Sequence, residues 1–321
     1  MKSELLRNTV TEYAQTYSVE SASILFDGIV SKSTIYRWVQ ASRALSYAYD
    51  IDQCMREWEI IKEKEGSYNA RPVHNKIVLT HQPHFYGKEN ELFKDKRIRN
   101  KLLKNRMRYL NKRIFSDREI LRGFKISGMH IGYSHFSPLW LKKFIKEYNI
   151  QGTIYDPCGG WGHRMIAAIS ERTNYVYNDL WTDTYNGVSE INTLINKDNS
   201  RCEISLYNND CTQFTPPLKY QTIFTCPPYF NTEIYNNAKF NTIQDYYIFI
   251  EKMIKQSVNS NTTTVGIVIN SPYIELISKT ISSMTSLQLV NEHILGSTSM
   301  KSHFNTNSNK KEVLLVFKEV Y

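Results

Sequence analysis

The sequence predicts an α/β protein, in which a doubly wound sheet is covered by helices on both faces and preceded by a helical region. Two observations carry this prediction. From residue 116 onward, short apolar segments alternate with amphipathic segments at helical spacing, which is the pattern of a sheet with crossover helices. Before residue 116, the segments are helical in pattern and rich in charge. We therefore expect three parts, at residues 1–45, 46–115 and 116–321.

The first part predicts three helices, over residues 4–17, 19–27 and 31–45. The third helix follows Gly28, and Ser31 can cap its first turn. Two helices around a short glycine-containing turn are typical of a helix-turn-helix, whose second helix presents its first side chains to a DNA major groove. An ordinary helical hairpin has the same spacing, so both interpretations stay open. The candidate DNA-contacting residues are Lys32, Ser33, Thr34 and Arg37.

The second part predicts a basic helical connector, interrupted by a loop at residues 69–89 where Pro and Gly occur. Between residues 94 and 122, Lys and Arg far outnumber Asp and Glu. The whole chain has a formal net charge of +9, which favours a polyanionic partner. The basic segment is interpreted either as a solvated helix face or as a surface that contacts phosphates. The candidate phosphate contacts are Lys101, Lys104, Arg106 and Arg108.

The third part predicts the sheet and its helices in alternation. The expected helices cover residues 137–148, 163–171, 187–197, 243–258 and 273–284. The expected strands cover residues 152–157, 175–180, 202–210, 220–229, 263–270, 287–295 and 312–320. In such a sheet, ligands bind in the loops beyond the carboxyl ends of the strands, so these loops are the candidate sites.

The loop after the first expected strand is rich in glycine. It reads "YDPCGGWGHR" and places Asp156 and Cys158 beside Gly159, Gly160 and Gly162. The glycines let a ligand approach the backbone, and the next helix offers its N-terminus. The stretch lacks the Gly-Lys-Ser/Thr ending of a phosphate-binding loop and does not match G-x-G-x-x-G. A plain tight turn would have the same composition.

An aspartate ends each of the next two expected strands. Asp179 follows the glycines at the distance where a carboxylate binds the two ribose hydroxyls of a nucleoside-containing cofactor. Asp210 lies at the end of the third strand, where a carboxylate can accept a hydrogen bond from an adenine amino group. Either residue alone suits an ordinary turn. Together, after a glycine turn, they favour a nucleoside cofactor.

The fourth expected strand ends in "TCPPYF", which contains Cys226, Pro227, Pro228 and Tyr229. Two consecutive prolines fix φ twice and remove two backbone donors, so the strand must stop there. The prolines also hold the backbone carbonyl of such a turn in a rigid, outward position. This turn is the candidate catalytic element.

With the preceding loops, the Cys-Pro-Pro-Tyr turn resembles the S-adenosylmethionine-dependent methyltransferases that act on exocyclic amino groups of DNA bases. In that family the turn is Asp, Asn or Ser followed by Pro-Pro and an aromatic residue, and the glycine motif is commonly Asp-Pro-Phe-x-Gly-x-Gly. The resemblance covers residues 120–321. It implies a Rossmann-like methyltransferase sheet, S-adenosylmethionine as cofactor and double-stranded DNA as partner. A cytoplasmic DNA modification, such as restriction–modification in a bacterial or virus-infected cell, would be the corresponding role.

The resemblance also implies residue roles. Asp179 would bind the cofactor's ribose, Asp210 its adenine, and Tyr229 would stack on a base flipped out of the duplex. A polar side chain and a carbonyl in the turn would draw the amino nitrogen toward sp³ geometry and aim its lone pair at the methyl group. No metal and no covalent enzyme intermediate is required. The residues implied at the methionine end of the cofactor are Asp156, Cys158, Gly159, Gly160 and Gly162.

Two positions depart from the family's pattern, since Cys158 replaces Phe and Cys226 replaces Asp, Asn or Ser. A thiol is a weaker hydrogen-bonding group than a hydroxyl but is nearly isosteric with Ser. Three interpretations of Cys226 follow: a substitute for Ser beside an active backbone carbonyl, a nucleophilic thiol, or an inactive site in a DNA-binding regulator. The first is favoured. Because Ser-Pro-Pro variants of the turn resemble the enzymes that act on cytosine and Asp-Pro-Pro variants those that act on adenine, the resemblance then implies N4 of cytosine over N6 of adenine. Methylation of RNA or of a protein amide is a further alternative.

The remaining expectations concern location, metal and target recognition. No apolar run approaches the length that spans a membrane, so we expect a cytosolic protein. The cysteines lack zinc-ligand spacing, so no metal is expected. Because few residues separate Tyr229 from the next helix, recognition is expected from residues 1–45 and 94–122. The loop at residues 296–311 is expected to help enclose the flipped base.

Overall fold

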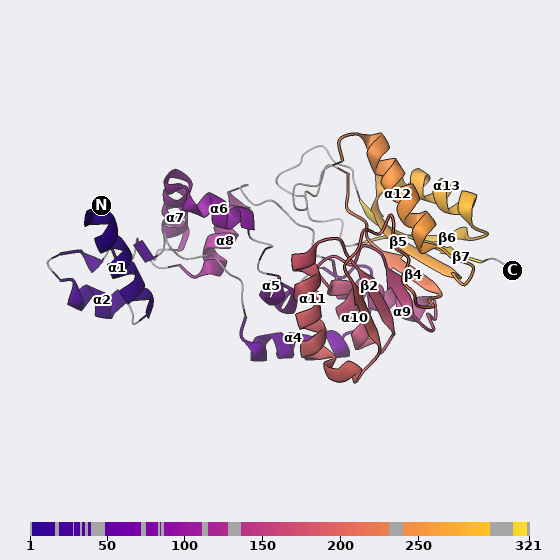
Figure 1. Ribbon diagram of the computed structural model, residues 1–321, viewed down its shortest axis with the longest axis horizontal. Coiled ribbons are helices and arrows are strands. Elements are labelled where there is room, and N and C mark those ends of the chain that lie inside the picture. Colours follow the sequence, from indigo (N-terminus) through magenta and orange to yellow (C-terminus); the bar gives the residue numbers. More distant parts are fainter. Residues whose placement is uncertain are drawn as a thin grey trace. The chain divides into compact units, whose positions relative to one another are not determined.

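Figure 1 shows a computed structural model of the chain, in which two compact units are distinguished. The first unit comprises residues 1–47 and 83–132, and the second comprises residues 48–82 and 133–321. The predicted domain boundaries at residues 45 and 115 stay predictions. The structure describes residues 2–16, 19–27, 29–32, 34–35, 38–39, 49–71, 75–82, 84, 87–110, 115–127, 136–230, 240–295 and 311–319.

In the described part of the second unit, seven strands form one sheet with the order β3-β2-β1-β4-β5-β7-β6. Strands β1 to β5 are parallel, and β7 is antiparallel to both of its neighbours. This order confirms the predicted doubly wound, Rossmann-like sheet. The strands are β1 (Ile154–Asp156), β2 (Tyr175–Asn178), β3 (Ile204–Tyr207), β4 (Thr222–Thr225), β5 (Thr264–Asn270), β6 (Gln288–Ile294) and β7 (Glu312–Lys318).

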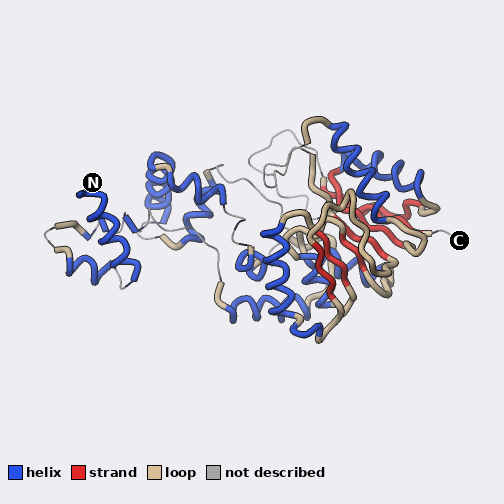
Figure 2. The backbone as a smooth tube through the Cα atoms, in the orientation of Figure 1, coloured by secondary structure: helices blue, strands red, loops and turns tan. Residues whose placement is uncertain are grey.

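The central strands are buried on both faces, which explains their nearly continuous apolar runs in the sequence. Helices enclose the sheet, as the tube in Figure 2 shows. They are α4 (Ile51–Glu63), α5 (Lys76–His81), α9 (Pro138–Glu147), α10 (His163–Ser170), α11 (Thr182–Ile195), α12 (Ile243–Ser257) and α13 (Ile274–Met284). Short 3₁₀ turns occupy Lys197–Asn199 and Ser271–Tyr273. Buried residues of α12 and α13 share one core with β1, β4, β5 and β7, whereas Phe144 of α9 packs on Phe224 of β4.

Helix α11 begins at Thr182 rather than at Gly187, where the sequence predicted its start. A glycine inside a helix is destabilising, so the sequence pattern placed Gly187 at a boundary. The structure explains the glycine by packing, because an added Cβ at residue 187 would lie 2.1 Å from the carbonyl oxygen of His81. His81 ends α5, a helix inside the segment that we predicted to be a loop at residues 69–89.

Buried polar contacts hold α4 and α5 to the sheet helices. Lys142 of α9 is 1% exposed, and its ammonium donates to the carbonyl of Ile61 at 2.6 Å and pairs with Glu171 at 3.1 Å. Glu57 of α4 accepts a hydrogen bond from the backbone N–H of Ile77 at 3.0 Å. Residues 48–82 therefore form part of the unit that carries the sheet.

The start of the first unit has a small core of its own. Helices α1 (Lys2–Thr16) and α2 (Val19–Leu25) pack together, and the described residues between 32 and 39 are helical. Ile35 is buried in this core with Val10, Ala14 and Ala22. Ser31 accepts from the backbone N–H of Thr34 at 3.3 Å, in agreement with the predicted cap.

The rest of the first unit consists of α6 (Gly87–Lys94), α7 (Lys96–Leu110) and α8 (Asp117–Ile126). Helix α8 packs on α7, and its first turn carries reciprocal hydrogen bonds between Ser116 and Glu119. Arg106 is 6% exposed, with its side-chain stem against Gly123 of α8. The prediction that Arg106 is a surface phosphate contact is therefore wrong, whereas Lys101, Lys104 and Arg108 are exposed as expected.

Candidate active site

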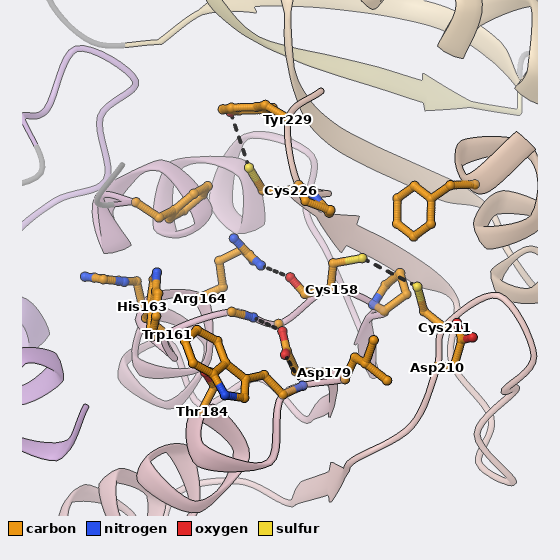
Figure 3. Close-up of a pocket in the computed structure, with 18 of the residues that line it drawn as sticks. Cys158, Trp161, His163, Arg164, Asp179, Thr184, Asp210, Cys211, Cys226 and Tyr229 are labelled. Atoms are coloured by element: carbon orange, nitrogen blue, oxygen red, sulfur yellow. Dashed lines mark hydrogen bonds between the residues drawn. The ribbon is translucent and has the colours of Figure 1, made fainter. Parts of the chain in front are cut away.

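A cavity of about 790 Å³ lies where the strand order reverses, beyond the carboxyl ends of β1 and β4. This is the position at which open α/β sheets bind ligands. The loops after the first four strands contribute to its wall (Figure 3). The predicted residues that line it are Cys158, Gly159, Gly160, Asp179, Asp210, Cys226, Pro228 and Tyr229. Asp156, Gly162 and Pro227 do not line it, and the candidate DNA contacts belong to the other unit.

The glycine loop lies directly against β2 because it has no side chains there. The backbone N–H of Gly159 donates to the carbonyl of Asn178 at 2.7 Å, and a Cβ at residue 159 would lie 2.1 Å from Cε2 of Tyr177. Gly160 has φ of +56°, which favours glycine, and its N–H donates to Asp179 at 2.9 Å. The loop thus leaves a backbone-lined cradle in front of α10.

Asp156 is fully buried and organises the site from behind. Its carboxylate accepts from Nε of Arg164 at 2.5 Å, from the hydroxyl of Thr225 at 2.8 Å and from the backbone N–H of Cys158 at 3.3 Å. The hydroxyl of Tyr175 also donates to it. The expectation that Asp156 lines the methionine end of the cavity is therefore not met. Instead, this carboxylate joins β1, β2, β4 and α10.

Arg164 brings a buried positive charge to the cavity wall. Its guanidinium donates to the carbonyl of Cys158 (Figure 3). It also pairs with Asp156 and lies over the ring of Phe136 at 5.0 Å. Burial lowers the pKa of Arg164, but the Asp156 carboxylate raises it, and the net shift is upward. The guanidinium is therefore charged at any physiological pH.

The two strand-end aspartates have different surroundings. Asp179 accepts from the backbone N–H groups of Gly160 and Trp181, both at 2.9 Å. Burial raises the pKa of Asp179 in spite of these donors. Asp210 accepts from the backbone and hydroxyl of Thr212 at 2.9 and 2.8 Å. Asp179 directly follows β2, whereas Asp210 lies in the loop three residues after the end of β3, and both reach the cavity.

The turn after β4 is linked to the start of β7. Sγ of Cys226 lies 3.4 Å from the hydroxyl of Tyr229, which donates to Oε1 of Glu312 at 2.9 Å. Tyr229 is only 3% exposed. Its predicted stacking on a base stays a prediction, but its hydroxyl has a defined acceptor. Because β7 is antiparallel, its first residue, Glu312, lies at the same edge of the sheet as the ends of the parallel strands.

Two further thiols line the cavity beside the glycine loop. Sγ of Cys158 lies 3.7 Å from Sγ of Cys211 (Figure 3). It also lies 3.6 Å from Sδ of Met253. The contact with Cys211 and burial raise the pKa of Cys158. Cys158 is therefore a neutral thiol that packs like a small apolar residue.

Several lining residues were not predicted as site residues. Trp161 and Arg164 lie inside the quoted glycine stretch, and Trp181 follows Asp179 closely, so proximity to those motifs was an available signal. The rings of Trp161 and Trp181 meet edge to face at 5.6 Å. Glu312 had no local signal because only the strand topology brings it to the cavity. The other unpredicted lining residues are Phe136, Pro157, His163, Leu180, Thr182, Asp183, Thr184, Cys211, Thr212, Phe240 and Phe249.

Within the ranges that the structure describes, no group of three or more His, Cys, Asp or Glu side chains is placed to hold a metal ion. No helix in those same ranges is long and apolar enough to cross a membrane. Ser33, Arg37 and most of the predicted loop at residues 296–311 lie outside the described residues.

No protein-family model and no curated protein sequence matches the chain. Among solved structures, TrmN from Thermus thermophilus is 12% identical with a TM-score of 0.39, over 63% of this chain and 53% of that chain, so the match spans about half of TrmN. The ribosomal protein L11 methylase of Lactobacillus delbrueckii subsp. bulgaricus is 13% identical with a TM-score of 0.39, over 59% and 81% of the two chains. A Listeria monocytogenes protein provisionally assigned to the class I S-adenosylmethionine-dependent methyltransferases is 12% identical with a TM-score of 0.45, over 84% and 89%. These similarities concern the fold alone.

Proposed function

We propose that the protein is an S-adenosylmethionine-dependent methyltransferase that modifies an exocyclic amino nitrogen of a DNA base. One observation carries the proposal: a single cavity joins the glycine loop, the two strand-end aspartates and the Cys-Pro-Pro-Tyr turn. Its volume of about 790 Å³ lies in the upper part of the range for small-molecule sites, which suits a cofactor and a base together.

The residues present fit the cofactor. Gly159 lets the loop pack directly on the ring of Tyr177, and an added Cβ at Gly160 would meet no atom nearer than 3.8 Å, so the backbone there is open to close approach. Asp179 would accept from the ribose hydroxyls, and Asp210 would accept from the adenine amino group. The charged guanidinium of Arg164 suits a carboxylate, as in the methionine part of the cofactor. When bound, the cofactor supplies a methyl group that its sulfonium already activates.

The turn after β4 would hold the acceptor base. A backbone carbonyl fixed by Pro227 and Pro228 can accept from one amino hydrogen and direct the nitrogen lone pair. The thiol of Cys226 lies at the same turn and is nearly isosteric with Ser, which favours N4 of cytosine over N6 of adenine. Phe240 and Phe249 add apolar faces to the cavity, as an extruded base requires.

DNA as the partner is supported by the surface of the first unit. One face of α7 carries a stripe of exposed cationic side chains over a length of about 16 Å. Its members are Arg97, Lys101, Lys104 and Arg108. Tyr109, 76% exposed, lies next to this stripe in sequence. Such a stripe suits phosphate contacts. The capped helix that begins after Ser31 would present its first side chains to the major groove.

The test measures transfer of a labelled methyl group from S-adenosylmethionine to three substrates, which are duplex DNA, single-stranded RNA and protein from a cell lysate. We expect label in the DNA alone, and we expect Asp210→Ala to lower the transfer by weakening cofactor binding. Label found only in RNA, or only in protein, would identify that molecule as the substrate in place of DNA. Tight binding of a duplex sequence with no transfer to any substrate would favour a regulator instead.

A further inference from the structure

We propose that Glu312 accepts, through the hydroxyl of Tyr229, the proton that the amino nitrogen loses when it is methylated. This proposal rests on the proposed function and deepens it. It assigns to β7 the polar group that the turn itself lacks, because position 226 carries a thiol where the resembling family has Asp, Asn or Ser. A thiol is a weak hydrogen-bond acceptor and a poor substitute for a carboxylate.

The protein's part of the path is a chain of contacts at one side of the cavity. Glu312, Tyr229 and Cys226 all line the same cavity. The hydroxyl of Tyr229 lies 2.9 Å from Oε1 of Glu312 and 3.4 Å from Sγ of Cys226, so it links the carboxylate to the first residue of the turn that would hold the base. Asn270 pairs with Glu312 in the β5–β7 register, which fixes the carboxylate's backbone at the end of two strands. The antiparallel direction of β7 thus delivers a carboxylate to the active edge of the sheet.

The chemistry balances without a further reactant. The lone pair of the neutral amino nitrogen forms the new bond to the methyl carbon, and the electron pair of the broken carbon–sulfur bond stays on sulfur. The nitrogen then carries one proton in excess. That proton passes to the oxygen of Tyr229 as the hydroxyl proton of Tyr229 passes to Glu312. The net result is a methylated neutral amine and a protonated Glu312, which water later deprotonates.

A purely structural role for Glu312 makes a different prediction. If the carboxylate only ties β7 to the turn, then Gln at this position would serve, because its amide oxygen can also accept from the Tyr229 hydroxyl. If the carboxylate takes a proton, then Gln fails and Asp retains part of the function. The Glu312→Gln and Glu312→Asp pair therefore separates the two roles, and Tyr229→Phe removes the relay while it keeps the ring.

The experiment measures single-turnover methyl transfer to duplex DNA and, separately, duplex affinity by fluorescence anisotropy with the demethylated cofactor product. We expect Glu312→Gln and Tyr229→Phe to lower the transfer rate by about 10²-fold or more, with Glu312→Asp in between, because positioned proton transfer contributes on that order. Duplex affinity should stay within about twofold, a free-energy change below about 0.5 kcal/mol. Glu292→Gln, an exposed carboxylate on the neighbouring strand β6, is the matched control and should behave as wild type.

Two results would overturn the proposal while the proposed function stands. One is a wild-type transfer rate in Glu312→Gln together with Tyr229→Phe. The other is a loss of duplex affinity that accounts for the whole loss of rate, since that identifies a structural role. Wild-type protein that transfers no methyl group to any nucleic acid would instead overturn the proposed function, and the proton path with it.

Discussion

The substitution Asp156→Asn should destabilise the sheet-bearing unit strongly. In the wild type, the carboxylate is 0% exposed and accepts from Arg164, Thr225, the Cys158 backbone and Tyr175. An asparagine keeps one acceptor oxygen but turns an NH₂ group toward donors. It also removes the negative charge, so the Arg164 guanidinium, whose side chain is 6% exposed, stays buried without its counter-charge.

The size of this effect follows from the burial. Because both partners are nearly inaccessible to water, solvent screening does not weaken the pair, and breaking it by removing one partner costs about 3–5 kcal/mol. For a unit of about 150–250 residues, each kcal/mol lowers the unfolding temperature by about 2–4 °C, so the expected decrease is about 6–20 °C. Thermal unfolding followed by circular dichroism, without ligand, measures it.

Asp210→Asn provides the matched control. This carboxylate lies in the loop after β3 and accepts from Thr212 and Gln213, which are neutral. Its substitution should cost less than about 1 kcal/mol in stability and should instead weaken cofactor affinity in calorimetry. A decrease of less than about 2 °C for Asp156→Asn, or an equal decrease for both variants, would refute the assignment of Asp156 to the framework of the site.

The other predictions concern the basic helix, the glycine loop and the turn. Lys101→Ala should leave the unfolding temperature unchanged and make the slope of log DNA affinity against log salt concentration less steep by about 1. Arg106→Ala should instead lower the unfolding temperature, because the buried stem of Arg106 packs on α8. The reverse pattern would contradict the placement of these residues. Gly159→Ala should cost about 1–3 kcal/mol and weaken cofactor binding, because its Cβ would lie 2.1 Å from the ring of Tyr177, and unchanged calorimetry would refute the close approach. Cys226→Ser should keep or raise methyl transfer, while complete loss of labelled product would point to thiol chemistry.

The strand ends could be predicted from the sequence because the residues that end a strand act on the local backbone. Proline, glycine and aspartate each restrict or permit particular backbone angles, so the loops containing Gly159, Asp179, Asp210 and Cys226 were identified and lie at one edge of the sheet. The start of α11 was misplaced because the reason for Gly187 is a distant contact with His81. A local sequence pattern indicates which backbone conformation a residue favours, but not which partner the residue packs against.

The same limit explains the errors at the level of single side chains. Arg106 and Lys101 are both cationic residues of the same basic segment. The packing of α8 buries Arg106 and leaves Lys101 exposed. Asp156 was assigned to the cavity because its motif lies there, whereas its four donors come from three other elements and from the loop itself. Glu312 was missed because an antiparallel last strand brings it to the site. Long-range packing decided each of these three cases.

The measurement that tests the proposed function most directly is mass spectrometry of the nucleosides from duplex DNA treated with the protein and isotopically labelled S-adenosylmethionine. It identifies the base and the methylated atom together. A labelled methyl group on an exocyclic amino nitrogen, with N4 of cytosine favoured, is the expected result. Label on a ring carbon, or DNA that is bound and carries no label at any base, would contradict the amino-methyltransferase assignment.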